Sequence, residues 1–284
     1  NSGEVQKAVD AVSAACTREA SGFEHYLTGP VFVRSATGLA LFADLKTMFP
    51  LAIFVTFLVC LAGLRSLAGV TLPLLANAVA LLITMAVFIR TGHELDFVTI
   101  IMPPVIFVVG FAYAVHVISD FERVCDSSID KITALKASLE EVFVPLTLTA
   151  FTTCIGFLSL TTSNIGTIQT FGAFSALGTG LSWLCAVTLI PTGLRFLPSK
   201  DHGTVKQSRL LLLVPRLSKF DLEHRNHILI AGFMLAVFAL AFASKIEVGI
   251  DYLRNFPEDS EIRRNFDEIG RTFSGAIPLQ ILIE

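Results

Sequence analysis

Six apolar segments, each long enough to cross a lipid bilayer, occupy most of the chain between residues 49 and 244. A hydrocarbon core of about 30 Å requires roughly 20 helical residues, because an α-helix rises about 1.5 Å per residue. Only 16% of the 284 residues are charged, whereas about 25% are charged in soluble domains. The sequence therefore predicts a polytopic α-helical membrane protein. The predicted spans are 49–64, 70–89, 97–117, 144–161, 170–194 and 227–244.

The distribution of basic residues predicts the orientation of these spans, because cytoplasmic loops carry an excess of Lys and Arg. If Arg65 is inside, the basic residues that also fall inside are Arg123, Lys131, Lys136, Arg195, Lys200, Lys206, Arg209, Arg216, Lys219 and Arg225. The short loops on the opposite side, 90–96 and 162–169, contain one basic residue between them, Arg90. Both ends of the chain are therefore expected on the outer side of the membrane.

The two ends have the patterns of partial α+β domains. The first end should contain a helix over 5–20, a short strand at Val31–Val33 and a second short helix over 39–46. The other end should contain a helix over 261–272 and a strand over 278–283. Since the chain starts without Met and stops within a predicted strand, we interpret it as a fragment of a longer protein.

Two features between the spans bear on the helix bundle. Pro103 and Pro104 should distort the first turns of the third span, because proline lacks a backbone N–H. The segment 120–141 is amphipathic, with apolar residues on one face. It is either a helix on the membrane surface or an ordinary connecting helix packed on the bundle.

No pattern in the sequence predicts catalysis or metal binding. There is no hydrolytic triad, Walker loop or dinucleotide fingerprint, and no CxxC or His/Cys cluster. The five cysteines are interpreted as unpaired small hydrophobic residues rather than a disulfide framework. We therefore expect neither an enzyme nor a cofactor or metal.

Ionisable groups inside apolar spans are costly in lipid, so they point to function. His116 is the clear example, and a histidine can titrate near neutral pH. Tyr113 precedes it by three residues and could share its hydrogen-bond network, which would make the pair a proton relay. The alternative for His116 is an interfacial histidine bonded to a neighbouring helix or to water. Asn77, near the middle of its span, is interpreted as an interhelical hydrogen bond.

The fourth and fifth spans are rich in small and hydroxylated residues, among them Thr149, Thr152, Thr153 and Gly156. Small residues allow close helix packing, and hydroxyls can bond across helices. Packing explains this composition most simply. A polar path for a substrate or an ion is the second interpretation, and Gly110 and Asn77 are candidates for the same structural or polar-path role.

Several motifs resemble the resistance–nodulation–division (RND) superfamily. The motifs lie at Gly110–His116, Thr149–Leu160, Phe171–Gly178, Leu27–Pro30 and Asn255–Ser260. The closest branch is the bacterial MMPL and predicted-exporter group, which is related to hopanoid transporters and to Patched. The resemblance extends over nearly the whole chain.

This resemblance implies a twelve-span, proton-driven exporter of lipids or other hydrophobic molecules in the bacterial inner membrane. Both ends would belong to periplasmic porter domains. The implied segments are the end of the first porter domain (1–46), spans two to six (47–197), a basic cytoplasmic linker (198–226), span seven (227–245) and the start of the second porter domain (246–284). Spans two to six correspond to the sterol-sensing domain of eukaryotic relatives. The implied partners are a hydrophobic substrate, membrane lipids, and a second copy or a periplasmic accessory protein, but no nucleic acid.

One departure from the family pattern concerns the proton pathway. Many members carry an acidic residue in the fourth span, and alignment on His116 puts Ala112 at that position. Three explanations follow: the missing half holds the acids, His116 and Tyr113 replace them, or protons do not drive the protein. The last explanation leads to the alternative function, a sterol-sensing-like membrane sensor or partner-binding scaffold that does not transport.

Overall fold

The computed structural model describes residues 2–19, 30–64, 67–125, 130–196, 213–243, 245, 263–265 and 268–269. The chain divides into two compact units. One unit comprises Asn1–Val12 and Pro30–Asp201, and the other comprises Ser13–Gly29 and His202–Glu284. All regular structure within the described residues is helical.

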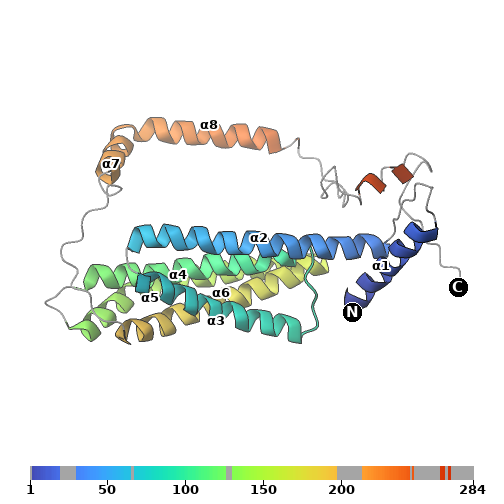
Figure 1. The fold of residues 1–284 in the computed structure, drawn as a ribbon. Coiled ribbons are helices and arrows are strands. Elements are labelled where there is room, and N and C mark those ends of the chain that lie inside the picture. Colours follow the sequence, from blue (N-terminus) through green and yellow to red (C-terminus); the bar gives the residue numbers. More distant parts are fainter. Residues whose placement is uncertain are drawn as a thin grey trace. The chain divides into compact units, whose positions relative to one another are not determined.

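The first unit contains five long helices that lie side by side (Figure 1). They are α2 (Pro30–Leu64), α3 (Leu67–Arg90), α4 (Met102–Val124), α5 (Lys131–Ser159) and α6 (Gly166–Phe196). Short 3₁₀ helices, η1 (Thr99–Ile101) and η2 (Leu160–Thr162), precede α4 and follow α5. Helix α6 packs against α3, α4 and α5, so the core of the bundle lies along this helix.

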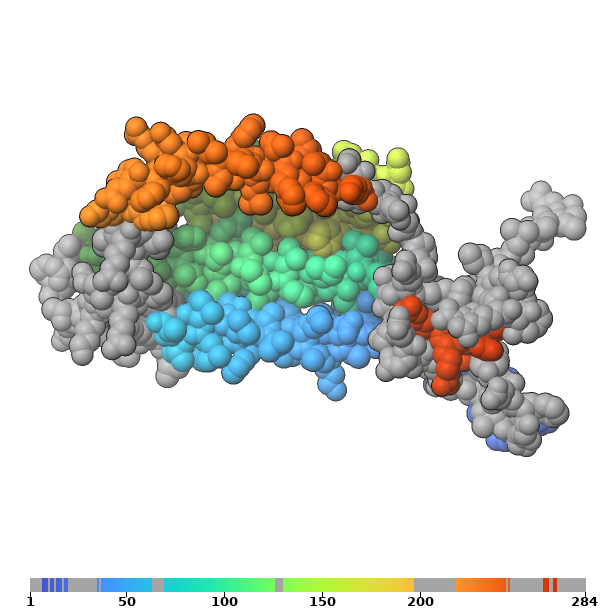
Figure 2. Space-filling model, turned by 90° about the horizontal axis from the view of Figure 1, so that it is seen from above, coloured from blue at the N-terminus to red at the C-terminus, as the bar shows by residue number. Residues whose placement is uncertain are grey.

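The outer surface of the bundle is apolar, as expected where lipid replaces water. Helix α2 contacts α3 and α4 and leaves Phe54, Leu58 and Val59 exposed. In Figure 2 the blue surface of α2 extends along the outside of the five-helix unit. Exposed apolar side chains are destabilising in water but stable against hydrocarbon tails.

Six of the described helical segments are long and apolar enough to cross a membrane, as the sequence predicted. They are Thr37–Ala62, Gly69–Arg90, Thr99–Val124, Lys131–Thr162, Gly166–Phe196 and Arg225–Ala243. The number and order of the predicted spans are confirmed. Their ends differ, because hydropathy marks the apolar part of a helix and not the polar turns that continue it.

The predicted strand at Val31–Val33 is wrong, because these residues belong to α2. The predicted short helix over 39–46 and the first span also form one helix of 35 residues, Pro30–Leu64. Proline at a helix start is favourable, since its φ angle suits the helix and its missing N–H would have no partner there. Three alternating residues are too few to distinguish a strand from a helix that continues beyond them. The proposed domain boundary between residues 46 and 47 therefore falls inside α2.

The first turn of the third span departs from α-helix, as predicted, but the departure is confined to the 3₁₀ helix η1 before Pro103 and Pro104. Helix α4 begins at Met102, so both prolines occupy its first turn. No intrahelical hydrogen bond is lost there, because the first N–H groups of a helix have no partner within it. The preceding turn is the 3₁₀ helix η1.

The segment 120–141 is the connecting structure rather than a separate helix on the membrane surface. Its first part completes α4, and α5 begins at Lys131 and continues without a break to Ser159. Ala134 and Ser138 are completely buried. Of the predicted apolar face, Leu135 and Val142 pack partly buried against the core, whereas Ile132 is 46% exposed, so the first turns of α5 pack on the bundle through only part of that face.

The remaining helices are described without placing them against the five-helix unit. Helix α1 (Ser2–Glu19) agrees with the predicted helix over 5–20. Helix α7 (Leu213–Glu223) precedes α8 (Arg225–Ala243), whose side chains are all exposed. Residues 263–265 and 268–269 are helical, as predicted for 261–272. The predicted strand over 278–283 lies outside the described residues.

Candidate functional site

A buried polar contact joins three helices near the middle of the bundle. Asn77 of α3 is 2% exposed, and its Nδ2 donates a hydrogen bond to the backbone oxygen of Phe107 in α4 at 2.5 Å. Ser182 of α6 donates its hydroxyl to Asn77 Oδ1 at 3.2 Å. The interpretation of Asn77 as an interhelical hydrogen bond is confirmed. In an apolar interior such a bond fixes the register of helices that hydrophobic packing alone holds loosely.

Gly110 of α4 makes this contact possible. A Cβ atom at residue 110 would lie 2.2 Å from Asn77 Oδ1 and 2.5 Å from Ser182 Oγ. Both distances are far below van der Waals contact. Glycine is therefore the residue that lets the α4 backbone approach the polar pair closely.

Helix α6 presents a row of buried hydroxyls along one face. Ser175, Thr179 and Ser182 are spaced four and three residues apart, and each is at most 2% exposed. The hydroxyls of Ser175 and Thr179 have no hydrogen-bond partner among the described residues. The sequence pattern had drawn attention to Ser175 among the small residues of this span, but not to the row as a whole. The i, i+4, i+7 spacing of small polar residues was the signal that could have identified it.

Tyr113 lies inside the bundle, whereas His116 lies on its outer surface. Tyr113 is 3% exposed, and its hydroxyl lacks a hydrogen-bond partner in the part of the chain that the structure describes. Thr153 of α5 is its polar neighbour. His116 is exposed on the outside of α4, as is Ala112. The predicted shared network between Tyr113 and His116 is therefore not formed, because the edge of the buried face passes between them.

The threonines of α5 bond mainly to their own helix. The hydroxyls of Thr149 and Thr153 donate to the carbonyls of Pro145 and Thr149 at 2.9 and 2.7 Å. Thr152 donates to Leu148 and Thr149 within α5, and Thr149, Thr152 and Gly156 are exposed. The structure does not bring these residues to the Asn77 contact. Of the residues predicted to form a polar path, Gly110 and Asn77 are the two that meet across helices, whereas the threonines bond to one another only within α5.

A charged cluster lies where α4 ends. Arg123 pairs with Asp120 at 2.8 Å and with Glu141 of α5. The Asp120 side chain is only 12% exposed, and its Oδ2 is buried without a hydrogen-bond partner within the described residues. The sequence prediction ended the third span at residue 117 and so placed no acid within it. The span-length helix extends to Val124 and includes Asp120.

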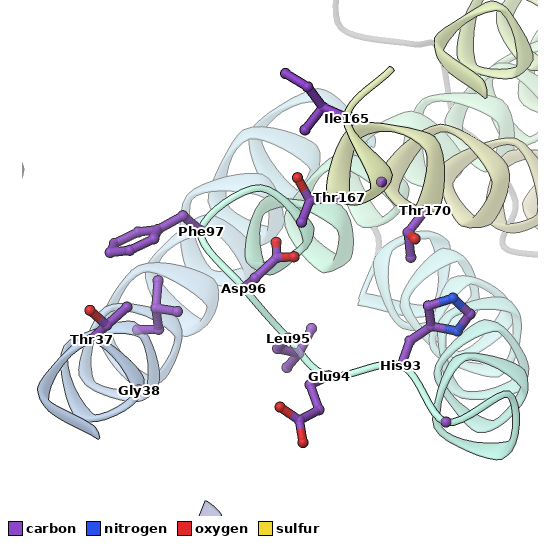
Figure 3. Close-up of a pocket in the computed structure, with 13 residues that line it drawn as sticks. Thr37, Gly38, His93, Glu94, Leu95, Asp96, Phe97, Ile165, Thr167 and Thr170 are labelled. Carbon is purple, nitrogen blue, oxygen red and sulfur yellow. The ribbon is translucent and has the colours of Figure 1, made fainter. Parts of the chain in front are cut away.

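A cavity of about 660 Å³ opens at the end of the bundle where α3 ends and α6 begins (Figure 3). Helix α2 contributes Thr37, Gly38 and Leu41 to its lining. The loop residues 92–97, Ile165 just before α6, and the α6 residues 166, 167 and 170 complete it. Its wall therefore combines apolar side chains with hydroxyls and ionisable groups, which is typical of a small-molecule site.

Two ionisable loop residues are held in place at this cavity. One carboxylate oxygen of Asp96 accepts hydrogen bonds from the backbone N–H groups of Val98 and Thr99 at 2.9 and 2.8 Å, which forms an Asx-type turn just before η1. The ring of His93 packs against Phe88 and Phe174, with ring centres 5.6 and 5.2 Å away. These two wall residues are therefore held in place, and Asp96 adds a negative charge to the wall.

The two regions differ in what they can do chemically. The Asn77 contact and the α6 hydroxyls can exchange hydrogen bonds but hold no charge. The cavity can accept a molecule with both an apolar and a polar part. No group of three or more His, Cys, Asp or Glu side chains that could bind a metal occurs in the described ranges.

Comparison with known proteins identifies one family. The model of the MMPL family matches residues 1–209, which is most of the chain. No curated protein matches the chain.

Proposed function

Because this chain belongs to the MMPL family of RND-type transporters, we propose that it exports lipids or other hydrophobic molecules and that the proton-motive force drives the export. The observation that supports this proposal best is the cavity at the end of the bundle. It combines apolar residues such as Leu41 and Phe97 with the carboxylate of Asp96. A pocket with both apolar and charged walls suits an amphiphile better than a sugar or an ion.

The location and partners belong to the same proposal. The protein would be a multi-pass component of a bacterial inner membrane, with both ends of this chain in the periplasm. Its partners would be a hydrophobic substrate and membrane lipids, with a second copy or a periplasmic accessory protein. It would be a transporter rather than an enzyme, with no cofactor and no nucleic acid.

Two groups on α4 are candidates for moving protons within this half. Tyr113 is buried and its hydroxyl is unbonded in the described region, so it can pass a proton to Thr153 or to water. Asp120 presents a buried carboxylate oxygen near the end of the same helix. His116, exposed on the outside of α4, would be a second relay that acts independently of Tyr113. These groups support coupling despite Ala112 at the position of the family acid.

One observation favours the alternative of a sensor that does not transport. The buried contact among Asn77, Gly110 and Ser182 is entirely neutral. A neutral contact has no charge that a proton could switch. In a sensor the same contact would hold α3, α4 and α6 in one arrangement while lipid binds at the cavity.

A complementation experiment tests export. Cells that lack the full-length protein should lose one lipid class from the outer envelope, and the wild-type gene should restore it. We expect Tyr113→Phe to reduce this restoration at least tenfold if Tyr113 carries protons. Removing a hydroxyl without a partner should leave the melting temperature nearly unchanged, so lost export would not reflect misfolding. His116→Ala should reduce export to a similar degree only if the exposed histidine is a second relay.

The outcome that contradicts export is an envelope lipid composition that does not change when the protein is removed. If His116→Ala left export and its pH dependence unchanged, His116 would be assigned as an interfacial histidine that carries no protons.

A further inference from the structure

Helices α3 and α6 run in opposite directions along a shared buried face. In the middle of the bundle, Asn77 of α3 and Ser182 of α6 form a hydrogen bond. At the cavity end of α3, the rings of Phe88 and Phe174 meet with their centres 5.0 Å apart. About two to three turns of each helix separate these two contacts. The buried hydroxyls of both helices lie along this stretch.

The α6 hydroxyl row (Ser175, Thr179 and Ser182) lies opposite buried polar groups of α3. Thr84 follows Asn77 by seven residues, which is about two turns, so both lie on one face of α3. Ser175 precedes Ser182 by the same seven residues. Because the helices are antiparallel, Thr84 and Ser175 share a level of the bundle, just as Asn77 and Ser182 do. All of these side chains are at most 2% exposed.

Two members of the row bond differently from other hydroxyls of α3 and α6. Thr84 and Thr188 each donate to the carbonyl four residues earlier in their own helix, at 2.8 and 2.6 Å. Ser175 and Thr179 do not, and their hydroxyls have no hydrogen-bond partner among the described residues. A buried hydroxyl without a partner is destabilising, and internal water is the common partner of such groups. The row therefore has hydrogen-bonding capacity that the described side chains and backbone leave unused.

Three aromatic rings separate the row from the cavity. His93 lines the cavity, and its ring centre is 5.6 Å from that of Phe88 and 5.2 Å from that of Phe174. The two phenylalanines are only 1% and 9% exposed, whereas His93 is exposed. Ser175 directly follows Phe174, and Thr84 precedes Phe88 by one turn. The three rings thus close the row on the side of the cavity.

We propose that the α6 hydroxyl row binds a file of internal water molecules, which enter from the cavity past the rings of Phe88, His93 and Phe174. Each water would bridge a hydroxyl of the row to Thr84 or to Asn77 on α3. A sugar, a lipid head group or another larger molecule does not fit, because Ser175 and Thr179 are completely buried.

This inference does not depend on the proposed export. It places a hydrated path between α3 and α6, whereas the sequence suggested a polar path along the threonines of α5. The path leads from the cavity to the Asn77 contact, where Gly110 leaves room for the polar pair. Water at this position would let the contact exchange partners without leaving a polar group unpaired.

Radiolytic labelling tests the presence of water directly. Brief X-ray exposure converts bound water into hydroxyl radicals, which oxidise adjacent side chains even inside a protein, and mass spectrometry locates the products. Ile106 is the reporter, because it is completely buried and its side chain lies 2.4 Å from the Cβ position of Gly178, beside the row. Ile190 of α6, equally buried in the apolar core, is the matched reference. In the purified full-length protein we expect Ile106 to be oxidised about fivefold faster than Ile190 or more.

Three variants test the row and the rings. Ser175→Ala with Thr179→Val removes both unpartnered hydroxyls and should reduce Ile106 oxidation to the rate of Ile190. Thr188→Val, at an exposed threonine that bonds within α6, is the matched control and should leave the rate unchanged. Phe174→Leu removes one ring of the closure and should raise the rate about twofold or more. The melting temperature of each variant shows that it is folded.

Equally slow oxidation of Ile106 and Ile190 in the wild type would overturn the inference, because the row would then be dry. Fast oxidation of Ile106 that persists in the Ser175→Ala, Thr179→Val variant would overturn it as well, since the hydroxyls would not hold the water. An unchanged rate in folded Phe174→Leu would contradict entry past the rings. None of these measurements requires transport, so they are decided separately from export.

Discussion

Gly110→Ala should lower the free energy of unfolding by about 2–3 kcal/mol, which is the upper part of the range for an overpacked core. The added Cβ would lie 2.2 Å from Asn77 Oδ1 and 2.6 Å from Ser182 Cβ. Asn77 cannot move away freely, because its amide group is bonded to Phe107 and Ser182. The gain in helix propensity from glycine to alanine, about 1 kcal/mol, is too small to compensate. The melting temperature of the purified protein measures the effect.

Gly156→Ala is the matched control, because a Cβ there meets nothing within 4 Å. It should keep or slightly raise the melting temperature. Combining Gly110→Ala with Asn77→Ala should destabilise the protein less than the two single effects added, since the second change removes the atom that clashes. A Gly110→Ala protein as stable as the wild type would show that the three-helix contact is looser than the structure indicates.

Gly172→Ala should destabilise the contact between α5 and α6 by about 3 kcal/mol. Its Cβ would lie 2.5 Å from the backbone oxygen of Phe157 and 2.7 Å from Leu160 Cβ. A backbone carbonyl in a helix cannot rotate away, so the two helices must separate locally. Loss of helix packing would appear as a lower melting temperature and as faster amide hydrogen exchange near η2.

Gly193→Ala is the informative comparison for this second variant. Its Cβ would approach Leu72 Cδ1 at 2.3 Å, which is a closer contact than that at Gly172. A leucine side chain can change rotamer, however, so we expect a cost of only about 1 kcal/mol. If Gly193→Ala proved more destabilising than Gly172→Ala, the distinction between flexible and rigid neighbours would be wrong for this bundle.

Hydropathy was enough to predict the membrane-spanning helices, because the bilayer selects for apolar length directly. Asn77 could be assigned from sequence for a related reason. A carboxamide in the middle of an apolar span needs a partner, and the facing helices are the available source. Neither inference required knowledge of which helices are neighbours.

The sequence could not predict which face of each helix is buried in the bundle. Tyr113 and His116 are about 60° apart around α4, and one is buried whereas the other is exposed. In a soluble protein the polar side of a helix marks the exposed face. In a membrane the buried face and the lipid-facing face are both apolar, so the sequence has no amphipathic pattern to distinguish them. The cavity was missed for a similar reason, because α2, the 92–97 loop and the start of α6 are far apart in the sequence. The strand predicted at Val31–Val33 failed because it was too short to define a period.

Reconstitution of the full-length protein into vesicles tests proton-driven export most directly. A fluorescent lipid would be followed from the vesicle membrane to an external acceptor, with and without an imposed proton gradient. The proposed function predicts transfer that requires the gradient and stops when a proton carrier dissipates it. Lipid binding without any transfer, at any gradient, would contradict export and would favour the sensor.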